Sequence, residues 1–353
     1  MIEEGGIKLC LKNIEITKKA ETFYNPEKKI DRDISIELLR ELGMVRFKML
    51  DLLAGSGIYS LRIAKELSPS LIIMNDLNPK AVETIKRNIE INKDKIRPST
   101  EIEVTCQDAR TFSYPEKFDY IDIDPFGSPV PYLPAAFVNL KRHGVISITS
   151  TDIGCLIGKY PLACRRRYGA SVLRCFEEKE LGIRVLIKRF AEIASMYDYG
   201  IKKVILSYWY KHIFRIFFEV KKSRTLASSN YEKILFCKYS EKEGWIFLEK
   251  NLNMCSGPLW TGEIWDKNFF LKIGGLFKKL SIKGILGRIR EEVKINTDMN
   301  IFYDIRRFVP KGKPLPKLRE IIEKTKKPVA PSIFSATGIR AEADFWEIKS
   351  LMM

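Results

Sequence analysis

KMLDLLAGSG, residues 48–57, is the stretch that decides the expected fold. It is a short apolar run that stops at two glycines, Gly55 and Gly57, and a helical pattern follows from about residue 59 to 67. Such a run is typical of a buried strand, and glycine lets the backbone turn tightly and approach a ligand closely. The stretch therefore predicts a strand, a ligand-binding turn and a helix. A tight turn without a ligand is the alternative that a lone G-x-G leaves open.

The same alternation continues along the chain. Further strands are expected at residues 71–74, 102–106, 118–123 and 144–149, with helices at 79–92 and 134–140. A helix near 176–199 and strands at 203–210 and 214–220 follow, and an earlier helix is expected over 33–42, capped by Asp33 or Ser35. Short apolar strands that alternate with helices form a parallel sheet covered on both faces. The fold class is therefore α/β with a doubly wound sheet, and the carboxyl ends of its strands form the ligand crevice.

The net charge lies in the second part of the chain. Residues 1–150 hold 22 Lys and Arg against 22 Asp and Glu, whereas residues 151–353 hold 39 against 22 and so carry the whole formal charge of +17. A basic part beside a neutral one suggests that one part does chemistry while the other attracts a polyanion, most commonly nucleic acid. A Lys-rich solvated surface is the alternative.

A domain boundary is expected where the composition shifts, at KKSRTLASSN, residues 221–230. Residues 1–222 are expected to form the catalytic domain with an N-terminal arm, and residues 223–353 a C-terminal α+β domain. Three tryptophans of this second domain, Trp245, Trp260 and Trp265, are expected in its core.

Aspartates follow successive strands of the predicted sheet. Asp76 ends the second strand, 19 residues after the second glycine, which suits a carboxylate that binds the ribose hydroxyls of an adenosine cofactor. Asp108 ends the third strand, where it could accept from an adenine amine, and Ala109 beside it offers a backbone N–H; Asp51 precedes the glycines. A dinucleotide would want G-x-G-x-x-G, but residues 55–60 read GSGIYS. The pattern favours S-adenosylmethionine over NAD.

DPFGSP, residues 124–129, closes the fourth strand, where a sheet of this kind carries its reactive loop. An aromatic amine is a poor nucleophile, because its lone pair is delocalised into its ring. The Asp124 carboxylate and a carbonyl beside Pro125 could accept from its N–H groups and stabilise a cationic transition state. Phe126 could stack on the base. The stretch predicts methyl transfer to an exocyclic amine, with a proline-rich turn as the alternative.

Longer stretches of the chain carry a family resemblance. They are FYNP (23–26), DRD (31–33), DLLAGSGIYSLRIAKE (51–66), NDLNPKA (75–81), DYIDIDPFGSPVPYLPAA (119–136), TSTDIGCLIGKYPLACRRRYGA (149–170), SYWYKHIFRIFFEV (207–220), GPLWTGEI (257–264) and SATGIRAEADF (335–345). With these stretches the chain resembles the tRNA (guanine-26 N2)-dimethyltransferase family, archaeal type, over nearly its whole length. The resemblance implies a class I S-adenosylmethionine-dependent methyltransferase fold and a C-terminal domain that helps to hold tRNA.

The resemblance also implies an activity and residue roles. The activity is transfer of methyl groups to the exocyclic N2 of guanine 26 in tRNA, giving N2-methyl- and N2,N2-dimethylguanosine. Arg32 resembles the arginine that holds the cofactor's carboxylate end, and Arg62 a second cofactor-contacting arginine. Asp76, Asp108 and Ala109 match the ribose and adenine contacts, and Asp124 the catalytic carboxylate. Phe23 and Asn25 belong to a loop that shields the target base.

The chain departs from the family's pattern in two places. It reads Tyr59 where the family usually has a basic residue, so one cation is absent near the crevice. Some members carry four zinc-binding cysteines before GPLW, whereas this chain has only Cys237 and Cys255 near that region and no C-x-x-C. Two cysteines cannot complete a tetrahedral site, and no metal is expected.

Basic residues elsewhere suggest contacts with RNA. Arg165, Arg166 and Arg167 could track phosphates, and Tyr168 could stack on a base. Residues 306–327 carry nine Lys and Arg against two acids and could also follow phosphates. A solvated surface is the alternative for both.

Other features exclude whole classes of protein. Seven cysteines with no C-x-x-C argue for free thiols, and neither a signal peptide nor a membrane-spanning apolar run is present, so the cytoplasm is the expected location. No obligate protein partner is implied. A DNA adenine-N6 methyltransferase, an enzyme for another tRNA guanine, and an RNA-binding protein without catalysis stay open as alternatives.

Overall fold

The structure is a computed structural model of the 353-residue chain. It describes residues 2–11, 22–272, 283–295, 301–310, 312–343 and 345–350. The chain forms two compact units. Unit 1 comprises Met1–Ser150 and Glu219–Lys222, and unit 2 comprises Thr151–Phe218 and Ser223–Met353. The part of the expected N-terminal arm at residues 12–21 lies outside the described residues.

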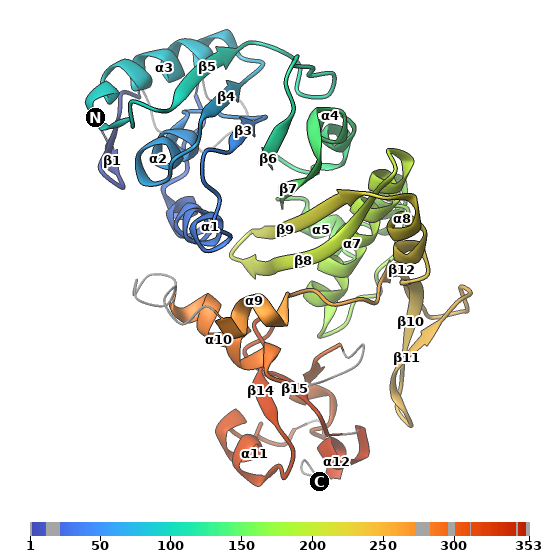
Figure 1. Cartoon of the computed structure of the whole chain (residues 1–353). Helices are drawn as coiled ribbons and strands as arrows, with labels where there is room; N and C mark the ends of the chain where they lie inside the picture. Colours follow the sequence, from blue (N-terminus) through green and yellow to red (C-terminus); the bar gives the residue numbers. More distant parts are fainter. Residues whose placement is uncertain are drawn as a thin grey trace. The chain divides into compact units, whose positions relative to one another are not determined.

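Unit 1 is built on a parallel sheet (Figure 1). Its strands are β3 (Lys48–Asp51), β4 (Leu71–Asn75), β5 (Glu101–Thr105), β6 (Phe118–Ile123) and β7 (Leu140–Ser150). They pair in the order β5-β4-β3-β6-β7, all parallel. The order continues with β9 (Ile213–Lys222) and β8 (Tyr199–Tyr210), and the last residues of β9 belong to unit 1. The predicted doubly wound α/β fold is confirmed.

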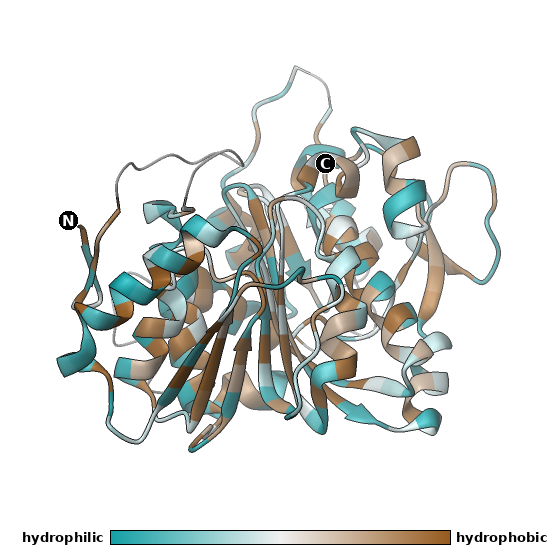
Figure 2. Ribbon diagram, turned by 90° about the horizontal axis from the view of Figure 1, so that it is seen from above, coloured by the Kyte–Doolittle hydropathy of each residue, from teal (hydrophilic) through white to brown (hydrophobic). Residues whose placement is uncertain are grey.

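Helices accompany the sheet of unit 1. They are α1 (Lys29–Glu41), α2 (Ile58–Glu66), α3 (Pro79–Glu90) and α4 (Leu133–Asn139), with 3₁₀ turns at Pro26–Lys28, Lys93–Lys95 and Val130–Tyr132. An antiparallel pair, β1 (Ile2–Glu4) and β2 (Ile7–Leu9), precedes them. All five residues of β4 are buried, as a strand covered on both faces requires. Figure 2 shows the apolar strands between helices whose outer faces are polar.

Helix α1 begins earlier than the sequence predicts. Asn25 accepts from the N–H of Glu27 and Pro26 opens the 3₁₀ turn, so the chain is already helical when it reaches Lys29. The predicted caps are wrong. Asp33 and Ser35 are buried inside the helix, where the Ser35 hydroxyl donates to the carbonyl of Asp31 at 2.7 Å.

Unit 2 contains helices and two small antiparallel sheets. Its first elements are α5 (Ile153–Leu156), α6 (Pro161–Tyr168), α7 (Glu178–Met196), β8, most of β9 and α8 (Arg224–Tyr231). One sheet has the order β11 (Gly244–Leu248), β10 (Ile234–Ser240), β12 (Ser256–Trp260). The other has the order β13 (Tyr303–Asp304), β15 (Gly338–Ala341), β14 (Val329–Pro331). The remaining helices are α9 (Lys267–Lys272), α10 (Lys283–Val293), α11 (Leu318–Lys324) and α12 (Phe345–Ser350), with a 3₁₀ turn at Ile305–Arg307.

The interior of unit 2 combines aromatic rings with buried ion pairs. Trp260 and Trp265 are buried, as predicted, and Trp245 packs partly buried against a cluster around Tyr303. Glu180 is fully buried and accepts from Arg184 at 2.8 Å and from Arg340 at 2.7 Å. These pairs satisfy charges that would otherwise be costly to bury.

Candidate active site

The loop after β3 is joined to the end of β4 by hydrogen bonds. The carboxylate of Asp76 accepts from the N–H of Gly55 and from the N–H of Asn78, both at 2.9 Å. Burial raises the pKa of Asp76. The N–H of Leu77 also acts on this carboxylate. Because a carboxylate offers about four lone-pair directions, Asp76 can still accept from a further donor, such as a hydroxyl group.

The glycine turn adopts the conformation for which glycine is needed. Gly55 has φ +56° and Gly57 has φ +74°, in the left-handed region that disfavours a side chain. A Cβ at Gly55 would lie 3.1 Å from the carbonyl oxygen of Phe23. The backbone of the segment before α1 thus lies directly against the turn.

Asp51 lies deeper, at the end of β3. It is buried, accepts from the Ser60 hydroxyl at 2.6 Å and pairs in register with Asp122 of β6. Burial, with the added repulsion of Asp122, raises the pKa of Asp51 to about 8. Asp122 was not singled out in the sequence; the alternation D-Y-I-D-I-D of β6 was the signal that could have found it.

Asp108 lies on the loop after β5 and is engaged by a neighbour. Arg110 donates to both of its carboxylate oxygens, with Nε at 3.0 Å from each. These hydrogen bonds lower the pKa of Asp108 to about 2. Ala109 between them is buried.

The segment Asp124–Phe126 follows β6 at the same edge of the sheet. The Phe126 ring is 38% exposed and meets the Phe23 ring edge to face, with 4.4 Å between the centroids. The Lys28 ammonium contacts both carboxylate oxygens of Asp124. Lys28 is a residue that the sequence reading missed. It is 96 positions from its partner, and nothing in the sequence says which carboxylate it meets.

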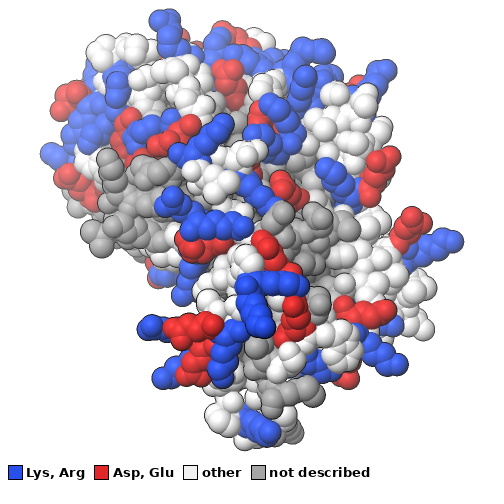
Figure 3. All heavy atoms as spheres, turned by 60° about the horizontal axis from the view of Figure 1, so that its bottom comes forward, with Lys and Arg blue, Asp and Glu red and all other residues white. Residues whose placement is uncertain are grey.

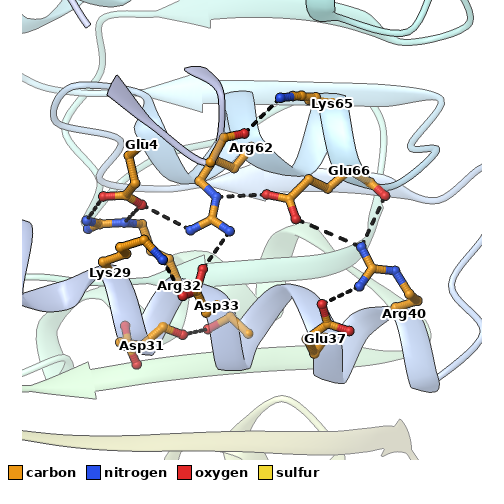
Figure 4. A network of polar contacts seen from close by, with 12 residues as sticks. Glu4, Lys29, Asp31, Arg32, Asp33, Glu37, Arg40, Arg62, Lys65 and Glu66 are labelled. Carbon is orange, nitrogen blue, oxygen red and sulfur yellow. Dashed lines mark hydrogen bonds and ion pairs between the residues drawn. The ribbon is translucent and has the colours of Figure 1, made fainter. Parts of the chain in front are cut away.

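The two arginines predicted to reach the cofactor lie in a buried ionic network (Figure 4). Arg32 donates to both oxygens of Glu4 and, through Nη2, to the carbonyl of Asn25 at 3.1 Å. Arg62 contacts Glu4 at 3.0 Å, Asp33 at 2.7 Å and Glu66 at 2.8 Å. The network ties β1, α1 and α2 together.

The basic cluster predicted to contact RNA lies on α6, in unit 2. Arg165, Arg166 and Arg167 are exposed; Arg165 donates to Ser171 and Arg167 pairs with Asp152. The prediction for Tyr168 is wrong. Its ring is 0% exposed and its hydroxyl donates to Asp152 at 3.1 Å, so it cannot stack on a base from solvent.

In the other basic stretch, residues 306–327, the first two arginines are paired with acids, whereas the lysines are exposed. Arg306 pairs with Asp304 at 2.7 Å, and Arg307 pairs with Glu177 and lies 3.8 Å from the Tyr239 ring. The lysines at 313, 317, 324, 326 and 327 are all exposed. On the face that Figure 3 shows, basic and acidic side chains are interspersed.

All seven cysteines are free thiols, and the described residues contain no group of three or more His, Cys, Asp or Glu placed to hold a metal ion. Within that same part of the chain, every helix is too short or too polar to cross a membrane.

Comparison with known proteins gives consistent matches. The profile of the family described as N2,N2-dimethylguanosine tRNA methyltransferase matches residues 5–353. A tRNA (guanine(26)-N(2))-dimethyltransferase of Pyrobaculum aerophilum is 34% identical over 325 residues, 90% of this chain and 86% of that protein. A tRNA (guanine(26)-N(2)/guanine(27)-N(2))-dimethyltransferase of Aquifex aeolicus is 30% identical over 393 aligned positions, 100% of this chain and 95% of that protein. The solved complex of Trm1 from Pyrococcus horikoshii with S-adenosyl-L-methionine superposes with a TM-score of 0.86 at 28% identity, covering 99% of both chains.

The sheet order, the glycine turn and the acidic strand ends define a Rossmann-like, S-adenosylmethionine-dependent methyltransferase, and this class is confirmed by the likeness to the solved complex. Within that class, the chain belongs to the N2,N2-dimethylguanosine tRNA methyltransferase family, because the family profile and the relatives span nearly all of it.

Proposed function

We propose that this protein transfers methyl groups from S-adenosyl-L-methionine to the exocyclic N2 of guanine 26 in tRNA, giving N2-methyl- and N2,N2-dimethylguanosine. The family match over residues 5–353 carries this proposal. The position of Asp124 supports it, at a strand end beside an exposed aromatic ring. We place the reaction in the cytoplasm and invoke no obligatory protein partner.

The residues at the strand ends fit the cofactor. Gly55 and Gly57 present backbone without side chains, and Asp76 keeps acceptor capacity for a ribose hydroxyl. Asp108 and Ala109 would bind the adenine end of the cofactor. Asp51, at the buried end of β3, would hold the glycine turn in place. When bound, the cofactor supplies an electrophilic methyl group on a sulfonium. We propose that Arg32 and Arg62 act at its carboxylate end mainly by fixing the segment around them, because their guanidinium groups are held by Glu4 and Asp33.

Asp124 acts on the target amine. Its carboxylate accepts a hydrogen bond from an N2–H, which orients the nitrogen lone pair and stabilises the positive charge that the nitrogen develops. On accepting the methyl group the amine would shed a proton, and Asp124 would receive it and pass it to water. The carbonyl before Pro125 offers a second acceptor for the same group.

The aromatic pair must open to admit the base. A base stacked between two rings needs about 7 Å between them, twice the normal contact distance. The centroids of Phe23 and Phe126 are 4.4 Å apart. We therefore propose that the Phe23 ring moves away from Phe126 as the guanine enters, that both rings then shield the base from water, and that Asn25 contacts the base from the turn, which stays in place.

Binding of the rest of the tRNA is proposed for the basic part of the chain. Residues 223–353 would form the tRNA-binding domain, with residues 1–222 as the catalytic domain. Arg165, Arg166 and Arg167 would contact phosphates, which position a nucleic acid without reading its sequence.

Mass spectrometry of nucleosides tests the proposal. An unmodified tRNA transcript is incubated with the protein and S-adenosyl-L-methionine, and its nucleosides are compared with those of a transcript whose guanine 26 is replaced by adenine. Dimethylguanosine that depends on guanine 26 is the expected result. Dimethylguanosine that persists in the replaced transcript would move the target to another guanine. Methylated adenosine, or no product with the cofactor bound, would overturn the proposed substrate.

A further inference from the structure

Lys28 is a lysine in an unusual place. It ends the 3₁₀ turn Pro26–Lys28 and is 7% exposed. Lysine is almost never buried to this extent without a partner, because a desolvated ammonium is costly. Its partner is Asp124, whose two carboxylate oxygens it contacts. The ammonium therefore lies where the proposed reaction needs the N–H groups of guanine.

The position of Lys28 is fixed by its surroundings. Asn25 caps the turn through Glu27, and Arg32 donates to the Asn25 carbonyl at 3.1 Å. Arg32 is itself held by Glu4, which Arg62 also contacts. The buried network of Figure 4 thus holds the turn that carries Lys28.

The charges around Asp124 explain what a cation does there. Asp122 and Asp124 lie at the same strand end, and the negative charges of both repel that of Asp51 on the neighbouring β3. Three carboxyl groups in one place disfavour one another's ionisation. Lys28, from the turn before α1, supplies an opposite charge at the carboxylate that the chemistry uses.

Resting on the proposed function, we propose that Lys28 is a positioning residue for Asp124. It keeps the carboxylate ionised and directed into the crevice while the site is empty, and the N2 amine of guanine displaces it from at least one oxygen. The ammonium is thus a stand-in for the substrate amine. It also makes no contact with the transferred methyl group, so its effect is exerted wholly through Asp124.

The pH dependence of the kinetics separates this role from a structural one. The profile of kcat/KM reports groups of the free enzyme, and that of kcat reports groups of the substrate complex. In Lys28→Met, the acid limb of kcat/KM should move up by about one to three pH units, the size of an opposite charge's effect on a carboxyl. The acid limb of kcat should move less, because guanine has replaced Lys28 by then. Lys28→Arg should restore the wild-type profile.

The neighbouring lysine provides a matched control. Lys29 is half-exposed and pairs with Asp33 at 2.7 Å, so Lys29→Met removes one cation from the same helix start without touching Asp124. Its profiles should match those of the wild type. A Lys28→Met profile that keeps its wild-type shape with a uniform loss of rate would overturn the proposal, and so would an equal change in Lys29→Met.

A labelling experiment tests the ion pair without relying on turnover. Brief treatment with acetic anhydride, read by peptide mass spectrometry, should modify Lys28 at least tenfold more slowly than Lys29 in the wild-type protein. Asp124→Asn should raise the Lys28 rate towards that of Lys29. Equal rates in the wild type would show that the pair does not exist in solution. Wild-type protein that methylates no tRNA guanine, with slow labelling of Lys28 intact, would count against the proposed function and not against the ion pair.

Discussion

The acids at the strand ends of unit 1 differ in their surroundings from the buried acids of unit 2 and from Glu4 and Asp33 of unit 1, which are paired with arginines. In unit 2, buried acids are matched with arginines: Glu180 with Arg184 and Arg340, and Glu177 with Arg307. At the strand ends of unit 1, Asp51 faces Asp122 and hydrogen-bonds a serine hydroxyl. A carboxylate that is paired with an arginine stabilises a packed interior. Adjacent carboxyl groups instead leave negative charge that a bound ligand can compensate. This contrast supports our proposal that the chemistry takes place at the strand ends of unit 1, whereas the buried ion pairs of unit 2 stabilise its interior.

Asp124→Asn should cause the largest loss of activity. The amide retains the shape but loses the charge that stabilises the developing cation, so kcat should fall by about 10²–10³-fold. Cofactor affinity, measured by calorimetry, should stay within about twofold. Asp119→Asn, on the same strand and paired with Lys141, is the matched control and should keep near-normal kcat. A comparable loss in both variants would mean that β6 has been disturbed and that Asp124 has no special role.

The free energy of unfolding should depend on pH through Asp51. Because its pKa is raised to about 8 in the folded protein, the folded state holds a proton that the unfolded state releases near pH 4. This group therefore makes stability fall as pH rises from about 4 to 8, by at most about 1.4 kcal/mol per pH unit. Asp51→Asn removes this dependence, so the variant should gain stability relative to the wild type over that range.

Urea denaturation of both proteins at pH 5, 6, 7 and 8 measures the effect of Asp51. Burial also raises the pKa of Glu292 in unit 2 to about 7, but Glu292 is present in both proteins and its contribution cancels in the difference. Two stability curves that run parallel over this range would show that Asp51 is already ionised in the folded state.

The arginines of α6 test whether unit 2 binds tRNA. Arg165→Glu with Arg166→Glu should weaken tRNA binding by roughly tenfold and flatten its salt dependence by about two ions, because phosphate contacts release counterions. The kcat at saturating tRNA should change little. Lys86→Glu with Arg87→Glu on α3 makes the same change of charge at exposed positions of unit 1. If that control weakens binding equally, the assignment of tRNA binding to the basic part is lost.

Local patterns in the sequence were enough to predict much of unit 1. The apolar runs, the glycine turn and the aspartates at strand ends depend on residues close in sequence, and the structure has them at the expected strand ends. The start of α1 differs from the prediction, because Asp33 and Ser35 have the polar character of caps but are buried inside the helix. Their environment comes from Arg62 and from the rest of the helix.

Ionic partners far apart in sequence could not be predicted. Glu4 meets Arg32 and Arg62 across 28 and 58 positions, and Lys28 meets Asp124 across 96. Charged residues have no periodicity that tells which opposite charge they will find in space. The sequence therefore predicts the aromatic rings of the candidate site and its acids other than Asp122, while the cation that contacts Asp124 became visible only in the structure.

Tyr168 gives the smallest and most discriminating test. The run R-R-R-Y suggested a stacking ring beside phosphate-binding arginines, but the ring is buried and its hydroxyl donates to Asp152, which Arg167 also contacts. Tyr168→Phe removes one hydrogen bond and should cost about 0.5–1.5 kcal/mol of stability, measured by urea denaturation. The affinity for tRNA should be unchanged, because the aromatic face is kept and never meets solvent. A loss of tRNA affinity with unchanged stability would instead mean that Asp152 and Arg167 depend on this hydroxyl to present the arginine cluster of α6 to RNA.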